Sequence, residues 1–126
     1  MAERLALLVD DDSHFASFLN ASLSPYGFSV EAIEDGAVAL EQVEARNPEL
    51  LFIAVELPDK AGYALCNKAK KGPARQIPVV LATSSVPSAD LDKHKKLRVH
   101  ADEYMDKRSV TPEELLARIG ALIDLG

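Results

Sequence analysis

Three consecutive carboxylates, Asp10-Asp11-Asp12, follow a short apolar run, and residues of this type and spacing are suited to chemistry. Acids this close together repel one another, and they are costly to remove from water unless a cation or a metal offsets their charge. One of them can cap a helix that starts here, a role open to Asp12 or to Ser13. A cap accounts for one acid and leaves an acidic pair of the kind that holds a divalent cation.

Two further polar groups follow apolar runs later in the chain. Thr83-Ser84-Ser85 is a cluster of small hydroxyls, and Lys107 supplies a positive charge. An acidic pair, a hydroxyl and a lysine that converge on one crevice suit a divalent cation together with a phosphoryl group. Simpler roles are open too, because Lys107 could pair with the acids and Thr83 could be a hydrogen-bonded hydroxyl at a strand end.

The elements between these groups decide whether they converge. Continuous apolar runs predict buried strands over residues 5–9, 50–55 and 77–82, and weaker patterns predict edge strands over 28–33 and 103–105. Apolar residues at helical spacing separate the strands, and a capping box at Thr111 with Pro112 begins the last helix. The four helical stripes consist of Phe15, Phe18, Leu19 and Leu23; Ala37, Leu40 and Val43; Tyr63, Ala64, Leu65 and Ala69; and Leu115, Leu116, Ile119, Leu122 and Ile123.

Strands that alternate with helices predict an α/β fold with a doubly wound, parallel sheet. We expect one domain over residues 1–126, with five strands in the flavodoxin-like order 2-1-3-4-5 and five helices. Ligands of such sheets bind beyond the carboxyl ends of the strands. Asp10, Thr83 and Lys107 each follow a predicted strand, so they should share that edge.

The composition excludes several classes of protein. Hydrophobic residues make up 48% of the chain, and no apolar run approaches the roughly 20 residues that span a bilayer. The net charge of −6 disfavours nucleic acid as a partner. A single cysteine, Cys66, excludes an internal disulfide, suits the cytoplasm and is expected to be a small buried residue. We therefore expect a cytoplasmic protein without a membrane segment.

The order and spacing of these residues resemble the receiver domain of two-component response regulators over essentially the whole chain. The matching residues are Asp10, Asp11, Pro58, Gly62, Thr83, Tyr104 and Lys107. The resemblance implies an aspartyl phosphate at the end of the third strand, four residues before the proline and eight before the glycine. Both counts lead to Ala54, and a methyl group cannot act as a nucleophile.

The resemblance therefore implies a pseudo-receiver, a signalling module that binds proteins independently of phosphorylation and is not an enzyme. Its degenerate acidic pocket would consist of Asp10, Asp11, Glu56, Thr83 and Lys107. No cofactor or metal is expected there, apart from weak Mg²⁺ binding at Asp10 and Asp11, because the acceptor carboxylate is missing. The family's proline after the lysine is replaced by Arg108, which predicts a trans peptide bond and a remodelled loop.

Two alternatives stay open from the sequence. The domain could still be switched, through Glu56 or Ser84 as a surrogate acceptor or through a small ligand in the acidic crevice. A flavin enzyme of flavodoxin-like fold is disfavoured, because a glycine-rich phosphate loop is missing after the first strand and three acids there would repel a phosphate.

Within the family, residues 94–104 and 120–123 resemble the pseudo-receiver of a myxobacterial gliding-motility protein. This implies a role in motility or polarity signalling, in a domain that heads a longer chain.

A basic segment in an acidic chain predicts a partner surface. It is expected on the fourth helix, which with the fifth strand and fifth helix forms the usual partner face of receivers, and it would suit an acidic protein. The basic residues are Lys93, His94, Lys95, Lys96, Arg98 and His100. The two histidines, six residues apart, are not spaced to share a metal on one helical face. Tyr104 matches the switch aromatic of the family and is expected in one fixed state, in a monomer or weak dimer.

Overall fold

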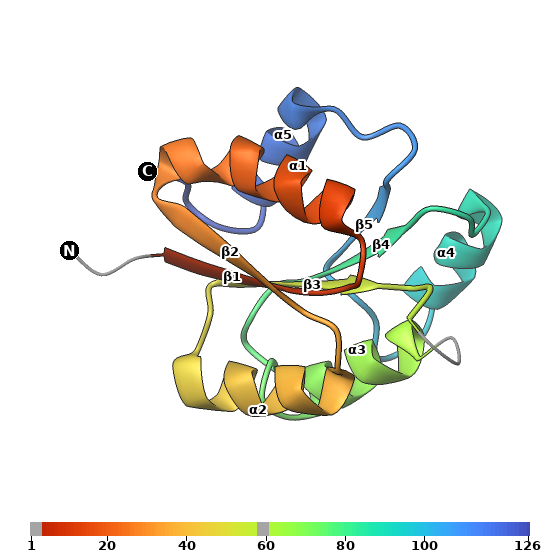
Figure 1. Cartoon of the computed structure of the whole chain (residues 1–126). Coiled ribbons are helices and arrows are strands. Elements are labelled where there is room, and N and C mark those ends of the chain that lie inside the picture. Colours follow the sequence, from red (N-terminus) through yellow and green to blue (C-terminus); the bar gives the residue numbers. More distant parts are fainter. Residues whose placement is uncertain (1–3, 58–60) are drawn as a thin grey trace.

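Five parallel strands form one sheet in the order β2-β1-β3-β4-β5, as predicted (Figure 1). This computed structural model describes residues 4–57 and 61–126. The buried central strands β1, β3 and β4 correspond to the three continuous apolar runs, and the two mixed segments form the edges. The strands are β1 (Arg4–Val9), β2 (Phe28–Ile33), β3 (Leu50–Ala54), β4 (Val79–Thr83) and β5 (Glu103–Asp106).

Helices cover both faces of the sheet. In Figure 1, α1 and α5 lie on one side, while α2 and α3 lie on the other and α4 lies beside α3. The helices are α1 (Ser13–Leu23), α2 (Gly36–Arg46), α3 (Gly62–Lys71), α4 (Ser88–Lys95) and α5 (Pro112–Gly120), with a 3-10 turn η1 (Ser24–Tyr26) after α1. No helix in the described part of the chain is long and apolar enough to cross a membrane.

The core consists of two layers, one on each face of the sheet. Side chains of β1 alternate between them, so that Leu7 and Val9 face α2 and α3 while Ala6 and Leu8 face α1 and α5. The predicted stripes supply most helical core residues. The second stripe was partly wrong, because Ala37 is exposed in the first turn of α2 and Ala39 packs in the core instead. The third was partly wrong too, because Ala64 is exposed and Cys66 is buried.

Side-chain caps define where three helices begin. The Asp12 carboxylate accepts a hydrogen bond from the amide of Phe15, which settles the choice left open between Asp12 and Ser13. Asp35 caps α2 through the amide of Ala37 at 2.8 Å. The Thr111 hydroxyl accepts from the amide of Glu114, as the capping motif predicted.

Gly62 lets the start of α3 approach the end of β3. A Cβ atom at this position would lie 2.2 Å from the carbonyl oxygen of Ala54 and 2.6 Å from the Cα of Val55. Because both neighbours are backbone atoms at the end of a central strand, moving them aside would disturb the packed sheet and cost stability. Glycine here therefore holds α3 against the strand end at which the candidate site lies.

The fourth helix is shorter than the basic segment suggested. Helix α4 ends at Lys95, and the residues after it form a turn and an irregular connection to β5. The prediction that the whole basic segment lies on this helix was therefore wrong. Among the side chains of α4 from residue 89 to residue 95, only Leu91 and His94 are buried.

Candidate functional site

The carboxyl ends of β1, β3 and β4 meet at one edge of the sheet, and Ala54 lies there. Ala54 is the last residue of β3, it is 2% exposed, and it pairs with Ala82 of β4. On the other side, Val9 pairs with Ile53, so Asp10 follows directly beside Ala54. The position at which the resemblance implied a phosphoacceptor thus lies beside Asp10 at the strand ends and carries a methyl group.

Lys107 binds two of the three acids that follow β1. Its ammonium nitrogen lies 2.5 Å from Asp10 Oδ2 and 3.2 Å from Asp12 Oδ2, and 4.9 Å from the centre of the Phe15 ring. Asp10 is 4% exposed, whereas Asp11 is exposed. The hydrogen bond from the Phe15 amide lowers the pKa of Asp12, and Lys107 lowers it further against the effect of burial. Lys107 therefore offsets the repulsion between Asp10 and Asp12, rather than that between the adjacent pair.

Glu56 is bound at a separate place, by the hydroxyl cluster after β4. Its Oε1 atom accepts from the Thr83 hydroxyl at 2.7 Å, from the Ser84 amide at 2.5 Å and hydroxyl at 3.0 Å, and from the Ser85 amide at 2.9 Å and hydroxyl at 3.2 Å. Burial alone would raise the pKa of Glu56, but these hydrogen bonds outweigh it and hold the pKa below its usual value.

The predicted pocket of five residues is therefore divided between two clusters. Asp10 belongs to the lysine cluster and Glu56 with Thr83 to the hydroxyl cluster, while Asp11 faces solvent. Neither the contact between Asp12 and Lys107 nor the role of the Ser84 and Ser85 amides was predicted. Both amides belong to the bend after β4, and residue type carries no signal for backbone donors.

The loop after Lys107 is held by Arg108. This guanidinium binds its own neighbour Asp106 at 2.8 Å and donates to the carbonyl of Val86, 3.2 Å away in the loop before α4. Among the described residues no peptide bond is cis, so the predicted trans bond after Lys107 is confirmed. Pro58, one of the residues on which the resemblance rests, lies outside the described residues.

The acids of the crevice do not fit a magnesium site. Mg²⁺ needs several oxygen ligands in octahedral geometry. Here Asp10 and Asp12 are bound to Lys107, Glu56 Oε1 is occupied by hydroxyls and amides, and Asp11 points to solvent. No group of three or more histidine, cysteine or acidic residues in residues 4–57 and 61–126 is arranged to hold a metal ion.

Tyr104 and His94 form a buried polar pair between α4 and β5. The Tyr104 hydroxyl lies 2.5 Å from His94 Nδ1 and accepts from the Ala101 amide at 3.2 Å. Burial raises the pKa of Tyr104 to about 12 and lowers the pKa of His94. His94 is only 6% exposed, so its place in the exposed partner surface was wrongly predicted, because it packs between the rings of Tyr63 and Tyr104.

The remaining basic residues are at the surface beside this pair. Lys95 lies 3.5 Å from Asp92 and 5.2 Å from the centre of the Tyr104 ring. We define the basic patch as the exposed residues Lys93, Lys95, Lys96, Arg98 and His100.

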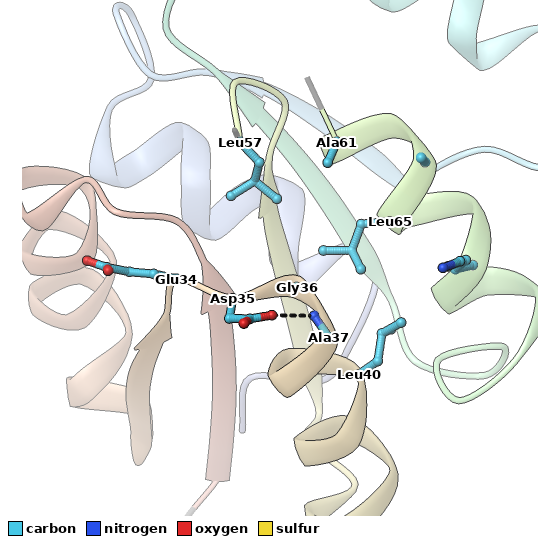
Figure 2. A pocket seen from close by; sticks show the side chains of 10 residues that line it. Glu34, Asp35, Gly36, Ala37, Leu40, Leu57, Ala61 and Leu65 are labelled. Atoms are coloured by element: carbon cyan, nitrogen blue, oxygen red, sulfur yellow. Dashed lines mark hydrogen bonds between the residues drawn. The ribbon is translucent and has the colours of Figure 1, made fainter. Parts of the chain in front are cut away.

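A mostly apolar pocket lies away from these clusters. It has a volume of about 690 Å³ and lies between the starts of α2 and α3 (Figure 2). Figure 2 shows Leu40, Leu57 and Leu65 lining it, with Asp35 bound to its own helix and Glu34 pointing away. Its walls are mostly apolar, and its charged lining residues are Glu34, Asp35 and Lys68, of which Asp35 is already engaged in capping α2.

Comparisons with known proteins agree with this geometry. A profile of the response regulator receiver domain matches residues 6–120. The regulatory protein VanRc of Enterococcus gallinarum is 33% identical over 119 residues, which cover 94% of this chain and 49% of VanRc, so the chain spans about half the length of this relative. A CheY-like receiver domain protein from Methanospirillum hungatei superposes with a TM-score of 0.78 at 26% identity, over 95% of this chain and 93% of that one. The receiver domain of a sensor histidine kinase from Pseudomonas aeruginosa, with a magnesium ion in its active site cleft, gives a TM-score of 0.77 at 21% identity, over 96% and 98%.

Proposed function

The chain belongs to the response regulator receiver domain family of two-component signalling, and from that premise we propose that it is a pseudo-receiver. In this proposal it binds proteins independently of aspartyl phosphorylation and is not an enzyme. In this proposal it acts in the cytoplasm as a monomer or weak dimer, in motility or polarity signalling. It uses no cofactor beyond weak Mg²⁺ binding, and neither nucleic acid nor a membrane is its partner.

The observation that carries the proposal is how the crevice around Ala54 satisfies its own charges. A phosphoryl group needs a nucleophile, and Ala54 offers none. It also needs cationic and hydrogen-bonding groups for its oxygens. Lys107 is bound by Asp10 and Asp12, and Thr83 donates to Glu56. The groups that would receive a phosphoryl oxygen therefore already bind carboxylates of the chain itself.

A surrogate acceptor is less well supported. Glu56 Oε1 accepts five hydrogen bonds, and these bonds lower the pKa of Glu56, which reduces its strength as a nucleophile. The Ser84 hydroxyl donates to the same oxygen. The only base that the structure places against this hydroxyl among the described residues is thus the Glu56 carboxylate, and its lowered pKa makes it a weak one.

Amide NMR spectra with Mg²⁺ and beryllofluoride, and separately with acetyl phosphate, test the loss of the switch. We expect no response at Asp10, Thr83 or Lys107. The Ala54→Asp variant is the matched control, because it restores a carboxylate at the centre of the crevice. A response of the wild-type protein at these residues would contradict the proposal, and a response of the variant alone would identify Ala54 as the cause of the loss.

For the partner we propose the basic patch, on the face formed by α4, β5 and α5. Its positive charge stands out in a chain of net charge −6, so an acidic protein segment is the complementary partner. Titration with an oligo-glutamate peptide should shift the amides of the patch, and the shifts should weaken as salt rises. Reversing Lys95, Lys96 and Arg98 to glutamate should abolish them. Equal binding by the reversed variant would exclude this surface.

A further inference from the structure

A second groove, of about 680 Å³, lies between α3 and α4, beyond the ends of β3 and β4. It is distinct from the basic patch, although Lys93 lies at the rim of both. Its walls combine carboxylates, aromatic rings and apolar side chains, among them Glu56, Tyr63, Asn67, Asp90, His94 and Leu97. Leu97 is 50% exposed, which leaves a large apolar side chain at the mouth of the groove.

Buried polar atoms without a protein partner gather at this groove. In the described part of the chain, four buried side-chain polar atoms make no hydrogen bond, and three of them are Tyr63 Oη, Asn67 Oδ1 and His94 Nε2. The fourth belongs to Glu31, which has an ion pair with Arg46. All three atoms thus belong to residues that line one groove. Native proteins keep such atoms rare, and each one calls for an explanation such as a functional role or a bound water or ion.

The contacts of Tyr104 determine which atom of the His94 ring carries the proton. The Ala101 amide donates to the Tyr104 hydroxyl, so the hydroxyl is free to donate its own proton to His94 Nδ1. Nδ1 is then the acceptor, and in the neutral ring the proton is on Nε2. His94, 6% exposed, therefore presents an N–H donor without an acceptor among the described residues.

The charge on the other side of the groove is negative. Glu56 and Asp90 both act on Tyr63, because after burial these two carboxylates are the causes that raise the pKa of its hydroxyl. The cation in the lining, Lys93, has a side chain that is 81% exposed and lies 4.0 Å from Asp90, so solvent screens it. The Tyr63 hydroxyl therefore lies in the electrostatic field of two carboxylates, and it has no hydrogen-bond partner among the described residues.

We propose that this groove binds a peptide segment of a partner protein through a basic side chain. The ammonium or guanidinium group lies against Glu56, Asp90 and the Tyr63 hydroxyl. A backbone carbonyl of the peptide accepts the proton of His94 Nε2, and the apolar stem of the side chain packs on Leu97. This site stands on the groove alone and does not depend on the lost phosphoryl switch or on the basic patch.

The charge of the ligand can be tested with matched peptides. Blocked peptides that contain arginine, lysine, citrulline or glutamate at one position between alanine and leucine are titrated into the full chain and followed by amide NMR. We expect the arginine and lysine peptides to shift residues of the groove, and citrulline, neutral but of the same shape as arginine, to bind roughly ten-fold more weakly. Equal binding of citrulline, tighter binding of glutamate, or no shift at millimolar peptide would overturn the proposal.

Two variants of α4 locate the site. Asp90→Asn should weaken the arginine peptide several-fold, whereas Asp92→Asn, a carboxylate of the same helix outside the groove, should leave it unchanged. Agmatine, which has the guanidinium group and no backbone carbonyl, should bind more weakly than the peptide and should not shift His94. If agmatine binds as tightly as the peptide, the site recognises a free organic cation and the peptide proposal is wrong. Equal effects of the two variants would show that general charge, not the groove, governs binding.

Discussion

Replacing Lys107 by methionine tests whether the chain depends on its lysine cluster for stability. Methionine keeps the length of the apolar stem and removes the ammonium group that binds Asp10 and Asp12. The Asp10 carboxylate, 4% exposed, would then keep a hydrogen bond from the Asp12 amide at 3.2 Å and no cation. A buried charge without its partner strongly favours the unfolded state, where water solvates it.

The size of this effect follows from the burial of the pair. Removing one member of a buried ion pair costs about 3–5 kcal/mol. We expect the lower end, about 3 kcal/mol, because Asp12 is partly exposed and water can approach that side of the cluster. For a chain of 126 residues this corresponds to a decrease in Tm of about 11 °C, given an unfolding entropy of about 2.1 cal/mol/K per residue.

Urea unfolding followed by circular dichroism measures the free energy of unfolding directly. Lys93→Met is the matched control, and we expect it to cost less than about 0.5 kcal/mol because its ion pair is exposed. Adding Asp10→Asn to Lys107→Met should recover part of the loss, since no charge then stays buried. If the free energy of unfolding of Lys107→Met lies within about 1 kcal/mol of the wild-type value, the reasoning is refuted, because burying a carboxylate without its cation should cost more than that.

Three further predictions concern the strand ends and the core. Gly62→Ala should destabilise the fold by about 3 kcal/mol in urea unfolding, because the new Cβ meets strand backbone, and a loss below about 1 kcal/mol would contradict that contact. Glu56→Gln should remove a pH-dependent part of the free energy of unfolding, because folding lowers the pKa of Glu56. The stability advantage of the wild type should be full above the usual pKa of 4.5 and should be lost as pH falls through the folded pKa. Parallel curves of unfolding free energy against pH for the two proteins would exclude this. Cys66, fully buried with its pKa raised to about 12, should react with Ellman's reagent only as fast as the protein opens, and rapid labelling of the native protein would show that it is accessible.

Much of the fold could be predicted from the sequence because its signals are local. A continuous apolar run such as 50–54 is stable only when both of its faces are covered, and this places the run in a central strand. The cap at Thr111 involves residues three positions apart, so it too can be recognised from the chain. The exchange of Ala37 for Ala39 shows the limit of this approach, because small residues carry little signal for which side of a helix is buried.

The sequence predicted which residues belong to the site better than it predicted which of them contact each other. Asp10 and Lys107 meet as expected, since parallel strands bring their carboxyl ends together. The direction of Glu56 could not be predicted, because its donors are hydroxyls and amides of a loop about 28 residues away, and those amides are present whatever the residue type. His94 looked like one member of a basic run, and only its packing between Tyr63 and Tyr104 removes it from the surface.

The order of the elements and the sheet edge at which the polar groups meet follow from the periodicity of the sequence and the chirality of the crossovers. The methyl group at position 54 follows from residue identity. Which charged and polar groups pair with each other depends on the tertiary structure. Lys107 forms an ion pair with Asp12 and not with Asp11, and Glu56 accepts a hydrogen bond from Thr83. The physical reason is that an ion pair or a hydrogen bond acts over a few ångströms and needs a specific direction, and only the packed fold brings residues far apart in the chain to such positions.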